Sequence, residues 1–227
     1  MEIKMTENKK IVIDEQYQNR RFIYHFFKRA IDIIASGAGL ILLSPLFLII
    51  SLAIKAEDRG PIFYSQIRLG KGQRPFKMYK FRSMIVDADK KLEDLLEKNE
   101  VDGAMFKMKH DPRITKVGRF TRKHSLDELP QLWNVLIGDM ALVGPRPPLE
   151  REVAEYSEYD RQRLAVKPGC TGLWQVSGRN DVDFDGMVDL DLNYIEHSGI
   201  LLDIFILLRT VGIVFKPNGC LLYTSDA

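Results

Sequence analysis

The chain has 227 residues, of which 45% are hydrophobic and 28% charged, and its formal net charge is +2. These values are typical of a globular protein with a packed core and exclude an intrinsically disordered chain. The two cysteines, Cys170 and Cys220, do not have the spacing of a disulfide framework or a zinc site. A nearly neutral chain without a recognised nucleic-acid-binding motif argues against a nucleic acid partner.

Residues 33–54, "IIASGAGLILLSPLFLIISLAI", contain no charged side chain. About 20 such residues are enough to cross a bilayer as a helix. The uncharged run is too long for a secretory signal peptide, and no small-residue cleavage site follows it. The segment therefore predicts that the chain is attached to a membrane.

Ser44 and Pro45 lie in the middle of this segment. Pro45 has no amide hydrogen and its ring clashes with the carbonyl of Ile41, so a kink is expected there. The Ser44 hydroxyl can satisfy part of the disturbed backbone. Basic side chains stand on both sides of the segment: Arg20, Arg21, Lys28, Arg29, Lys55, Arg59, Arg68, Lys71 and Arg74. Positive flanks favour the cytoplasmic side, so a helix that dips in and returns is preferred over a single span, which remains the alternative.

Residues 61–84 predict a β-hairpin with a turn at Gly70-Lys71-Gly72. Lys80 and Arg82 fall on its second strand, where the simplest interpretation is a solvated basic side. Residues 86–99 have leucines at helical spacing and predict a surface helix.

Residues 113–125 carry five cations with apolar residues between them and predict a short helix. Arg119 and Arg122 belong to this cationic set, which suits either anionic headgroups or a phosphorylated ligand. Residues 199–215 are apolar except for Asp203 and Arg209, and predict a helix lying against the membrane or the core.

Asp127 and Glu128 are adjacent carboxylates in the stretch "HSLDELPQLWNVLIGDM". In one interpretation Ser125 and Glu128 form a capping box of a helix. In the other, Pro130 is the first helical residue and the two carboxylates precede the helix. That helix would carry an apolar stripe and end at Gly138, the stripe being Leu132, Trp133 and Leu136. Both interpretations place the carboxylates near the positive end of a helix, which favours the ionised form.

Arg146 stands between Pro145 and Pro147, on a backbone with little freedom. It is either a rigidly presented phosphate ligand or a surface arginine in a turn. An ionised carboxylate, a cluster of cations and a divalent metal together suit phosphoryl transfer through a covalent acyl-phosphate.

Four ordered stretches resemble the bacterial sugar transferase family, the monotopic phosphoglycosyl transferases that begin polysaccharide assembly on polyprenyl phosphate. They are "KRAIDIIASGAGLILLSPLFLIISLAIK", "GPIFYSQIRLGKGQRPFKMYKFRSM", "SLDELPQLWNVLIGDMALVGPRPP" and "KPGCTGLWQVSGRNDV". The resemblance implies that Asp127 attacks the β-phosphate of a UDP-sugar, releases UMP and passes the phosphosugar to undecaprenyl phosphate. It implies Mg²⁺ as cofactor with Asp127 as its contact, and Glu128 as a base or part of the metal site.

The resemblance also assigns roles to other positions. Lys28 and Arg29 match the pair at which the family's helix enters the membrane, and Ser44 and Pro45 match the break of its re-entrant helix. We expect the substrate phosphates to be bound by Arg146, Arg119, Arg122, Lys80 and Arg82. The implied location is the bacterial inner (cytoplasmic) membrane, with the catalytic domain on the cytoplasmic face.

The expected fold is α+β and mainly helical, with a re-entrant helix, a small β-hairpin and interfacial amphipathic helices around a compact core. The expected parts are a polar tail at 1–24, the membrane helix at 25–56, the catalytic domain at 57–218 and a non-core tail at 219–227. The resemblance favours transfer of a hexose-1-phosphate, from glucose or galactose, over an N-acetylated or diamino sugar. The competing hypothesis is a membrane-anchored adaptor without activity. Expected partners are a UDP-sugar, polyprenyl phosphate and membrane lipid, with homodimer formation left open.

Overall fold

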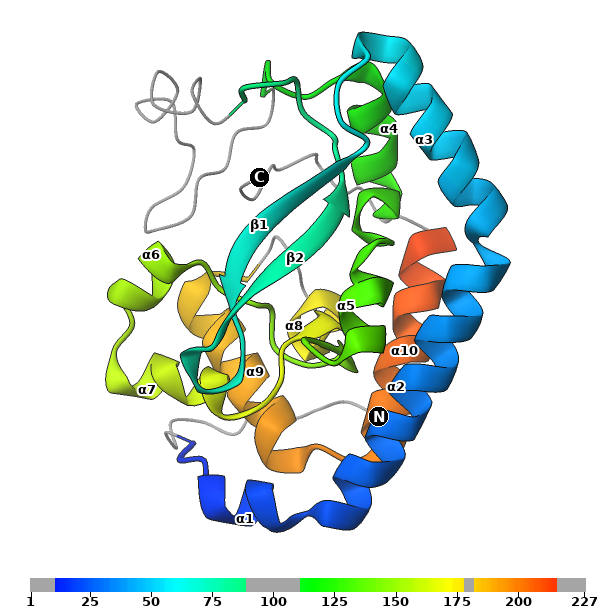
Figure 1. Ribbon diagram of the computed structural model, residues 1–227. Coiled ribbons are helices and arrows are strands. Elements are labelled where there is room, and N and C mark those ends of the chain that lie inside the picture. The colour runs from blue at the N-terminus through cyan, green and yellow to red at the C-terminus, as the bar shows by residue number, and fades with distance from the viewer. Residues whose placement is uncertain (1–10, 89–110, 178–181, 216–227) are drawn as a thin grey trace.

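The computed structural model describes residues 11–88, 111–177 and 182–215. Helices dominate these residues, and the strands form two small sheets (Figure 1). In one sheet β1 (Phe63–Leu69) pairs antiparallel with β2 (Pro75–Phe81), and in the other β3 (Ala141–Val143) pairs parallel with β4 (Gly169–Thr171). The expectation of a mainly helical fold with a small hairpin is confirmed.

The helices lie mostly where the sequence pattern places them. Residues 113–125 contain α4, and residues 199–215 contain α10; the helix expected at 86–99 lies largely outside the described residues. The α-helices are α1 (Glu15–Arg20), α2 (Phe22–Leu42), α3 (Ser44–Asp58), α4 (Lys116–Lys123), α5 (Gln131–Ile137), α6 (Glu150–Ala154), α7 (Glu158–Arg161), α8 (Leu173–Ser177), α9 (Phe184–His197) and α10 (Ile200–Phe215). Short 3-10 helices are η1 (Lys71–Gln73), η3 (Leu126–Glu128) and η4 (Gln162–Ala165).

The long apolar segment is broken between α2 and α3, whose axes differ by 58°. The Ser44 hydroxyl donates a 2.8 Å hydrogen bond to the Ile41 carbonyl, the group that Pro45 displaces. The predicted kink and its repair by Ser44 are thus confirmed. Among the described residues no single helix is long and apolar enough to span a membrane, and α2 with α3 meets that test only as a bent pair.

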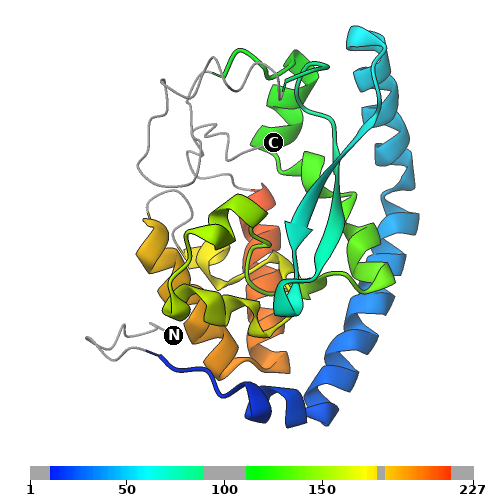
Figure 2. The same ribbon diagram turned by 60° about the vertical axis from the view of Figure 1, so that its left-hand side comes forward.

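The bent pair forms one side of the molecule, with α5 packed against α2 and α4 against α3 (Figures 1 and 2). Gly39 permits the close approach of α5, because a Cβ added there would lie 3.2 Å from Leu132 Cδ1. At Gly37 an added Cβ would lie 3.9 Å from Leu136 Cδ1, which is an ordinary contact distance. The predicted stripe on α5 is therefore correct for the two leucines, whereas Trp133 is 49% exposed.

The hairpin is held against the bent pair by a small apolar cluster of Ile50 and Ile54 from α3 with Phe81 from β2. Gly72 adopts φ of +62° in the hairpin turn, a conformation that favours glycine. The main core lies between α5, the β3–β4 sheet, α8, α9 and α10, with fully buried Val135, Met140, Leu192, Ile195 and Ile206.

The N-terminal part of the chain is packed into the fold from Ile11 onward. Ile13 belongs to the main core, and Gln18 of α1 donates through Nε2 to the Ile195 carbonyl at 2.8 Å. Residues 15–24 of the expected tail therefore form α1 and the start of α2. The expected tail at 219–227 lies outside the described residues.

Candidate active site

Asp127 and Glu128 lie in η3, the turn between α4 and α5. Ser125, just before the turn, adopts φ of +54° in the left-handed region. Asp127 is buried, with 6% of its surface exposed, whereas the Glu128 side chain is 43% exposed. The two carboxylates therefore occupy different environments, as expected of adjacent side chains that point apart.

The capping-box interpretation is wrong, because Ser125 makes no side-chain cap bond. Helix α5 begins at Gln131, directly after Pro130, and ends at Gly138, whose φ is +97°. The alternative, in which a proline starts the helix and the carboxylates precede it, is confirmed to within one residue. Ser125 and Glu128 thus do not form the capping box.

Burial raises the pKa of Asp127 from its ordinary value, and the neighbouring negative charge of Glu128 raises it further. Lys80 and Arg122 act in the opposite direction. For Asp127, the expectation that a helix end would favour the ionised carboxylate is thus wrong. Loss of hydration outweighs the positive end of a short helix.

Two of the predicted phosphate ligands, Lys80 and Arg122, interact with the carboxylate pair. Lys80 of β2 forms an ion pair with Glu128, with 3.1 Å between Nζ and Oε1. Arg122, in the last turn of α4, donates through Nε to the Ser83 hydroxyl at 2.7 Å, and its charge acts on Asp127. Cations from two separate elements, Lys80 on strand β2 and Arg122 on helix α4, thus act on the carboxylate pair.

Asn134 fixes the position of β2 relative to α5. Its Oδ1 accepts from the Tyr79 amide at 3.0 Å and its Nδ2 donates to the Lys77 carbonyl at 2.6 Å. Asn134 is fully buried, and its side chain forms hydrogen bonds with backbone groups at the edge of the strand that carries Lys80. No local pattern in the sequence marks this role, because the partners are far apart along the chain.

Arg82, directly after β2, and Arg119, on α4, are two further predicted phosphate ligands. Arg82 forms a bidentate ion pair with Asp58 at the end of α3 and donates to the Met84 carbonyl at 3.2 Å. Arg119 is exposed on α4. Arg82 thereby connects the hairpin to the bent pair, and a phosphate role for either arginine stays a prediction.

The acidic end of α3 also organises α4. Glu57 accepts hydrogen bonds from the amides of Lys116 and Val117, at 2.7 and 3.0 Å, and so caps the cationic helix. The structural roles of Glu57 and Asp58 were not predicted from the sequence. Their signal was the pair of acids shortly after the apolar run.

Arg146 is paired with Glu152, with 3.3 Å between Nη1 and Oε1. Burial works against the ionised form of Glu152, but Arg146 and Arg68 overcome it and lower its pKa. The Arg146 carbonyl accepts from Arg163 at 3.5 Å. Arg146 is therefore a partly buried member of a polar network, a more ordered position than a surface turn.

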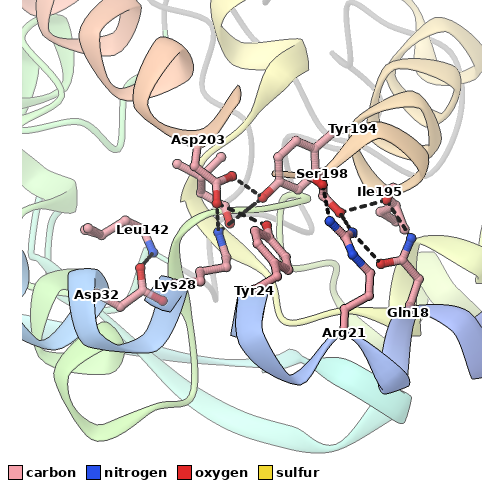
Figure 3. A network of polar contacts seen from close by, with 11 residues as sticks. Gln18, Arg21, Tyr24, Lys28, Asp32, Leu142, Tyr194, Ile195, Ser198 and Asp203 are labelled. Atoms are coloured by element: carbon pink, nitrogen blue, oxygen red, sulfur yellow. Dashed lines mark hydrogen bonds and ion pairs between the residues drawn. The ribbon is translucent and has the colours of Figure 1, made fainter. Parts of the chain in front are cut away.

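Lys28 and Arg29 connect α2 to the rest of the fold. Lys28 pairs with Asp203 of α10 at 2.9 Å, within a network that includes Tyr24 and Tyr194 (Figure 3). Arg29 donates to the carbonyls of Val135 and Leu136, at 2.6 and 2.8 Å, and so caps the end of α5. Their contacts fix the direction in which α2 leaves the domain.

The carboxylate pair suits magnesium. The described ranges contain no cluster of three or more metal-binding side chains. Mg²⁺, however, is usually held by one or two carboxylates together with substrate phosphates and water. A divalent cation would also offset the repulsion by which Glu128 raises the pKa of Asp127. The chemistry of Asp127 and Glu128 therefore fits a bound Mg²⁺ ion.

The family model described as bacterial sugar transferase matches residues 23–217. This range covers both carboxylates, all of the bent helix pair except its first residue, and the cations of the candidate site. The chain therefore belongs to the bacterial sugar transferase family.

Three relatives illustrate the similarity. The galactosyl transferase CpsE of Streptococcus agalactiae is 48% identical over 193 residues, which are 85% of this chain and 43% of the relative. The undecaprenyl-phosphate galactose phosphotransferase of Salmonella typhimurium is 46% identical over 198 residues, or 86% of this chain and 41% of the relative. The exopolysaccharide production protein ExoY of Rhizobium meliloti is 41% identical over 196 residues, or 85% of this chain and 87% of the relative. The chain thus spans less than half the length of the first two relatives.

Proposed function

We propose that this protein transfers a sugar-1-phosphate from a UDP-sugar to polyprenyl phosphate, with undecaprenyl phosphate as the acceptor and Asp127 as the nucleophile. The observation that carries the proposal is the pairing of a buried carboxylate, Asp127, with a more exposed one, Glu128, between Lys80 and Arg122. Family membership and the names of the relatives support the reaction class.

In the first step a carboxylate oxygen of Asp127 attacks the β-phosphorus of the UDP-sugar. The bond between that phosphorus and the oxygen bridging to the α-phosphate breaks, UMP leaves with the bond's electrons, and a phosphosugar remains on Asp127. Because Asp127 is buried and Glu128 is exposed, the donor approaches from the Glu128 side. Lys80 and Arg122 offset the negative charge that gathers there.

In the second step a phosphate oxygen of polyprenyl phosphate attacks the same phosphorus. The bond to the Asp127 oxygen breaks, which restores the carboxylate and yields a lipid diphosphate sugar. Glu128 acts as a base or helps to hold Mg²⁺, which when bound neutralises charge on the phosphates. Arg146, Arg119 and Arg82 remain proposed ligands of the substrate phosphates.

The acceptor is confined to lipid and the donor is soluble, so the site must lie at the membrane surface. The bent pair exposes a large apolar surface, which includes Ile41, Leu42 and Leu48. Such a surface marks a membrane or protein contact. We propose that α2 and α3 dip into the cytoplasmic leaflet of the bacterial inner membrane and return, with the catalytic domain on the cytoplasmic face and α10 lying along the surface.

For the sugar we propose a hexose, galactose first and glucose second. Two of the relatives above carry galactose in their names. The N-acetylated and diamino sugars are the alternatives.

The test is a UMP-release assay on the full chain in detergent with Mg²⁺ and undecaprenyl phosphate, screening UDP-galactose, UDP-glucose and UDP-N-acetyl sugars. We expect UMP release with one hexose donor and its loss in Asp127→Asn. Asp87→Asn, which changes an exposed acid six residues after the end of β2, is the matched control and should retain activity. Equal turnover by Asp127→Asn and the unmodified chain would exclude the mechanism, and no release with any donor would favour the adaptor.

A further inference from the structure

A cavity of about 390 Å³ lies beside α1 and the first turns of α2. Four cationic side chains line it, and they come from three distant parts of the chain: Lys28, Arg29, Lys71 and Lys167. Arg29 contacts the last carbonyls of α5, whereas Asp127 precedes the first turn of that helix. Seven helical residues (α5) extend about 10 Å, so the cavity is separate from the carboxylate pair.

The positive charge of this cavity is only partly balanced. Lys28 is neutralised by Asp203, and Asp32 is the acid that lines the wall. The bonds of the other three cations go to uncharged oxygens in the described part of the chain. Arg29 donates to two carbonyls, Lys71 donates to Asn19 Oδ1 at 2.6 Å, and Lys167 donates to the Gly138 carbonyl at 2.8 Å. Ammonium and guanidinium groups hold several donors each, so donors remain for a ligand.

The cations also act on one another. Burial lowers the pKa of Lys167, and the charges of Arg29 and Lys71 lower it further, although Asp32 and Asp139 oppose them. Like charges held near each other are costly unless an anion joins them. The arrangement therefore suits a group with more than one negative oxygen.

Aromatic rings complete the lining, among them Phe22, Tyr24 and Tyr194. Figure 3 shows the two tyrosines. Phe22 is 76% exposed and begins α2, the helix that leads into the apolar bent pair. The cavity thus lies where a polar surface meets an apolar one. We propose that it is a second phosphate-binding site, which takes the phosphate of a lipid headgroup or of a soluble phosphate ester and is separate from Asp127.

The test is protection of Lys167 from acylation by an amine-reactive ester, measured by peptide mass spectrometry on the full chain. The soluble probes are inorganic phosphate and UMP, added to the protein in detergent. The lipid probe is reconstitution into phosphatidylcholine vesicles with or without phosphatidylglycerol. At a probe concentration about ten times its dissociation constant, acylation should slow about tenfold.

Matched variants show whether protection arises in the cavity. Lys71→Gln removes a lining cation and should weaken protection of Lys167. Lys77→Gln removes an exposed cation of the same hairpin that does not line the cavity, and should leave protection intact.

Protection by a soluble probe would assign the site to a free phosphate ester, and protection only with phosphatidylglycerol would assign it to a lipid headgroup. Unchanged acylation of Lys167 with every probe would overturn the proposal, as would equal protection in Lys71→Gln. Neither result would affect the proposed reaction, because Asp127 does not line this cavity.

Discussion

Lys80 on β2 and Glu128 on the turn before α5 form an ion pair of 3.1 Å, which joins the hairpin to the carboxylate pair. Both Lys80 and Glu128 act on the pKa of Asp127, the cation lowering it and the carboxylate raising it. The ionisation of the proposed nucleophile therefore depends on an element that lies far away in the sequence.

Lys80→Gln should impair the reaction. Removing this cation raises the pKa of Asp127 further, so the acidic limb of the pH profile of kcat/KM should move to higher pH. We expect a loss of activity of about tenfold or more near neutral pH, equivalent to about 1.4 kcal/mol of transition-state stabilisation. Lys77→Gln on the same strand is the control. An unshifted pH profile in Lys80→Gln would show that Lys80 does not control Asp127.

Asp127→Asn should stabilise the fold while it abolishes turnover. Burial and Glu128 raise the folded-state pKa of Asp127 above its unfolded value. The stability that such an acid contributes is complete below the unfolded pKa and is lost as pH rises through the folded pKa. The variant should therefore unfold at a higher temperature than the unmodified chain at about pH 8, and the difference should shrink towards about pH 4.

Thermal unfolding in detergent over this pH range measures the effect. A lower unfolding temperature for Asp127→Asn than for the unmodified chain at about pH 8 would contradict the raised pKa of Asp127.

Gly118→Ala should be strongly destabilising. A Cβ at this position of α4 would lie 2.6 Å from the carbonyl carbon of Ser83 and closer still to its oxygen, so α4 would have to move away from the end of the hairpin. Overpacking of this kind costs about 1–3 kcal/mol or more. Gly212→Ala in α10, where a Cβ meets nothing within 4 Å, should be neutral or stabilising. Equal effects of the two substitutions on thermal unfolding would contradict the packing of α4.

Pro45→Ala should straighten the bent pair. The alanine restores an amide that can bond the Ile41 carbonyl, which now accepts from the Ser44 hydroxyl. If the pair dips into the membrane and returns, both termini of the unmodified chain lie on one side of a closed vesicle. The variant should place part of the molecules with the termini on opposite sides.

Accessibility of tags at both termini in sealed vesicles measures this topology. Ser51→Ala, in the same helix and also bonded through its hydroxyl to a backbone carbonyl, is the control. Termini on opposite sides in the unmodified chain would exclude the dip.

Features determined by neighbouring residues could be predicted from the sequence. The break at Ser44-Pro45, the hairpin turn at Gly72 and the end of α5 at Gly138 each follow from the backbone preference of one or two residues. The two carboxylates could be proposed as a candidate site from the sequence because they are adjacent.

Contacts between distant segments could not be predicted. The partner of Arg82 is Asp58, 24 residues earlier, and nothing local distinguishes this arginine from an exposed one. The direction of the Asp127 pKa was predicted wrongly because burial depends on how α4, α5 and the hairpin pack together. Gly39 acquires its packing role only when α5 lies against α2.

The covalent intermediate offers the most direct measurement. The full chain is incubated with Mg²⁺ and a UDP-hexose without polyprenyl phosphate, quenched in acid and mapped by peptide mass spectrometry. We predict a hexose-phosphate adduct on the peptide that contains Asp127, a matching amount of UMP, and no adduct in Asp127→Asn. Release of UMP only when polyprenyl phosphate is present, with no adduct on the protein at any time, would contradict it.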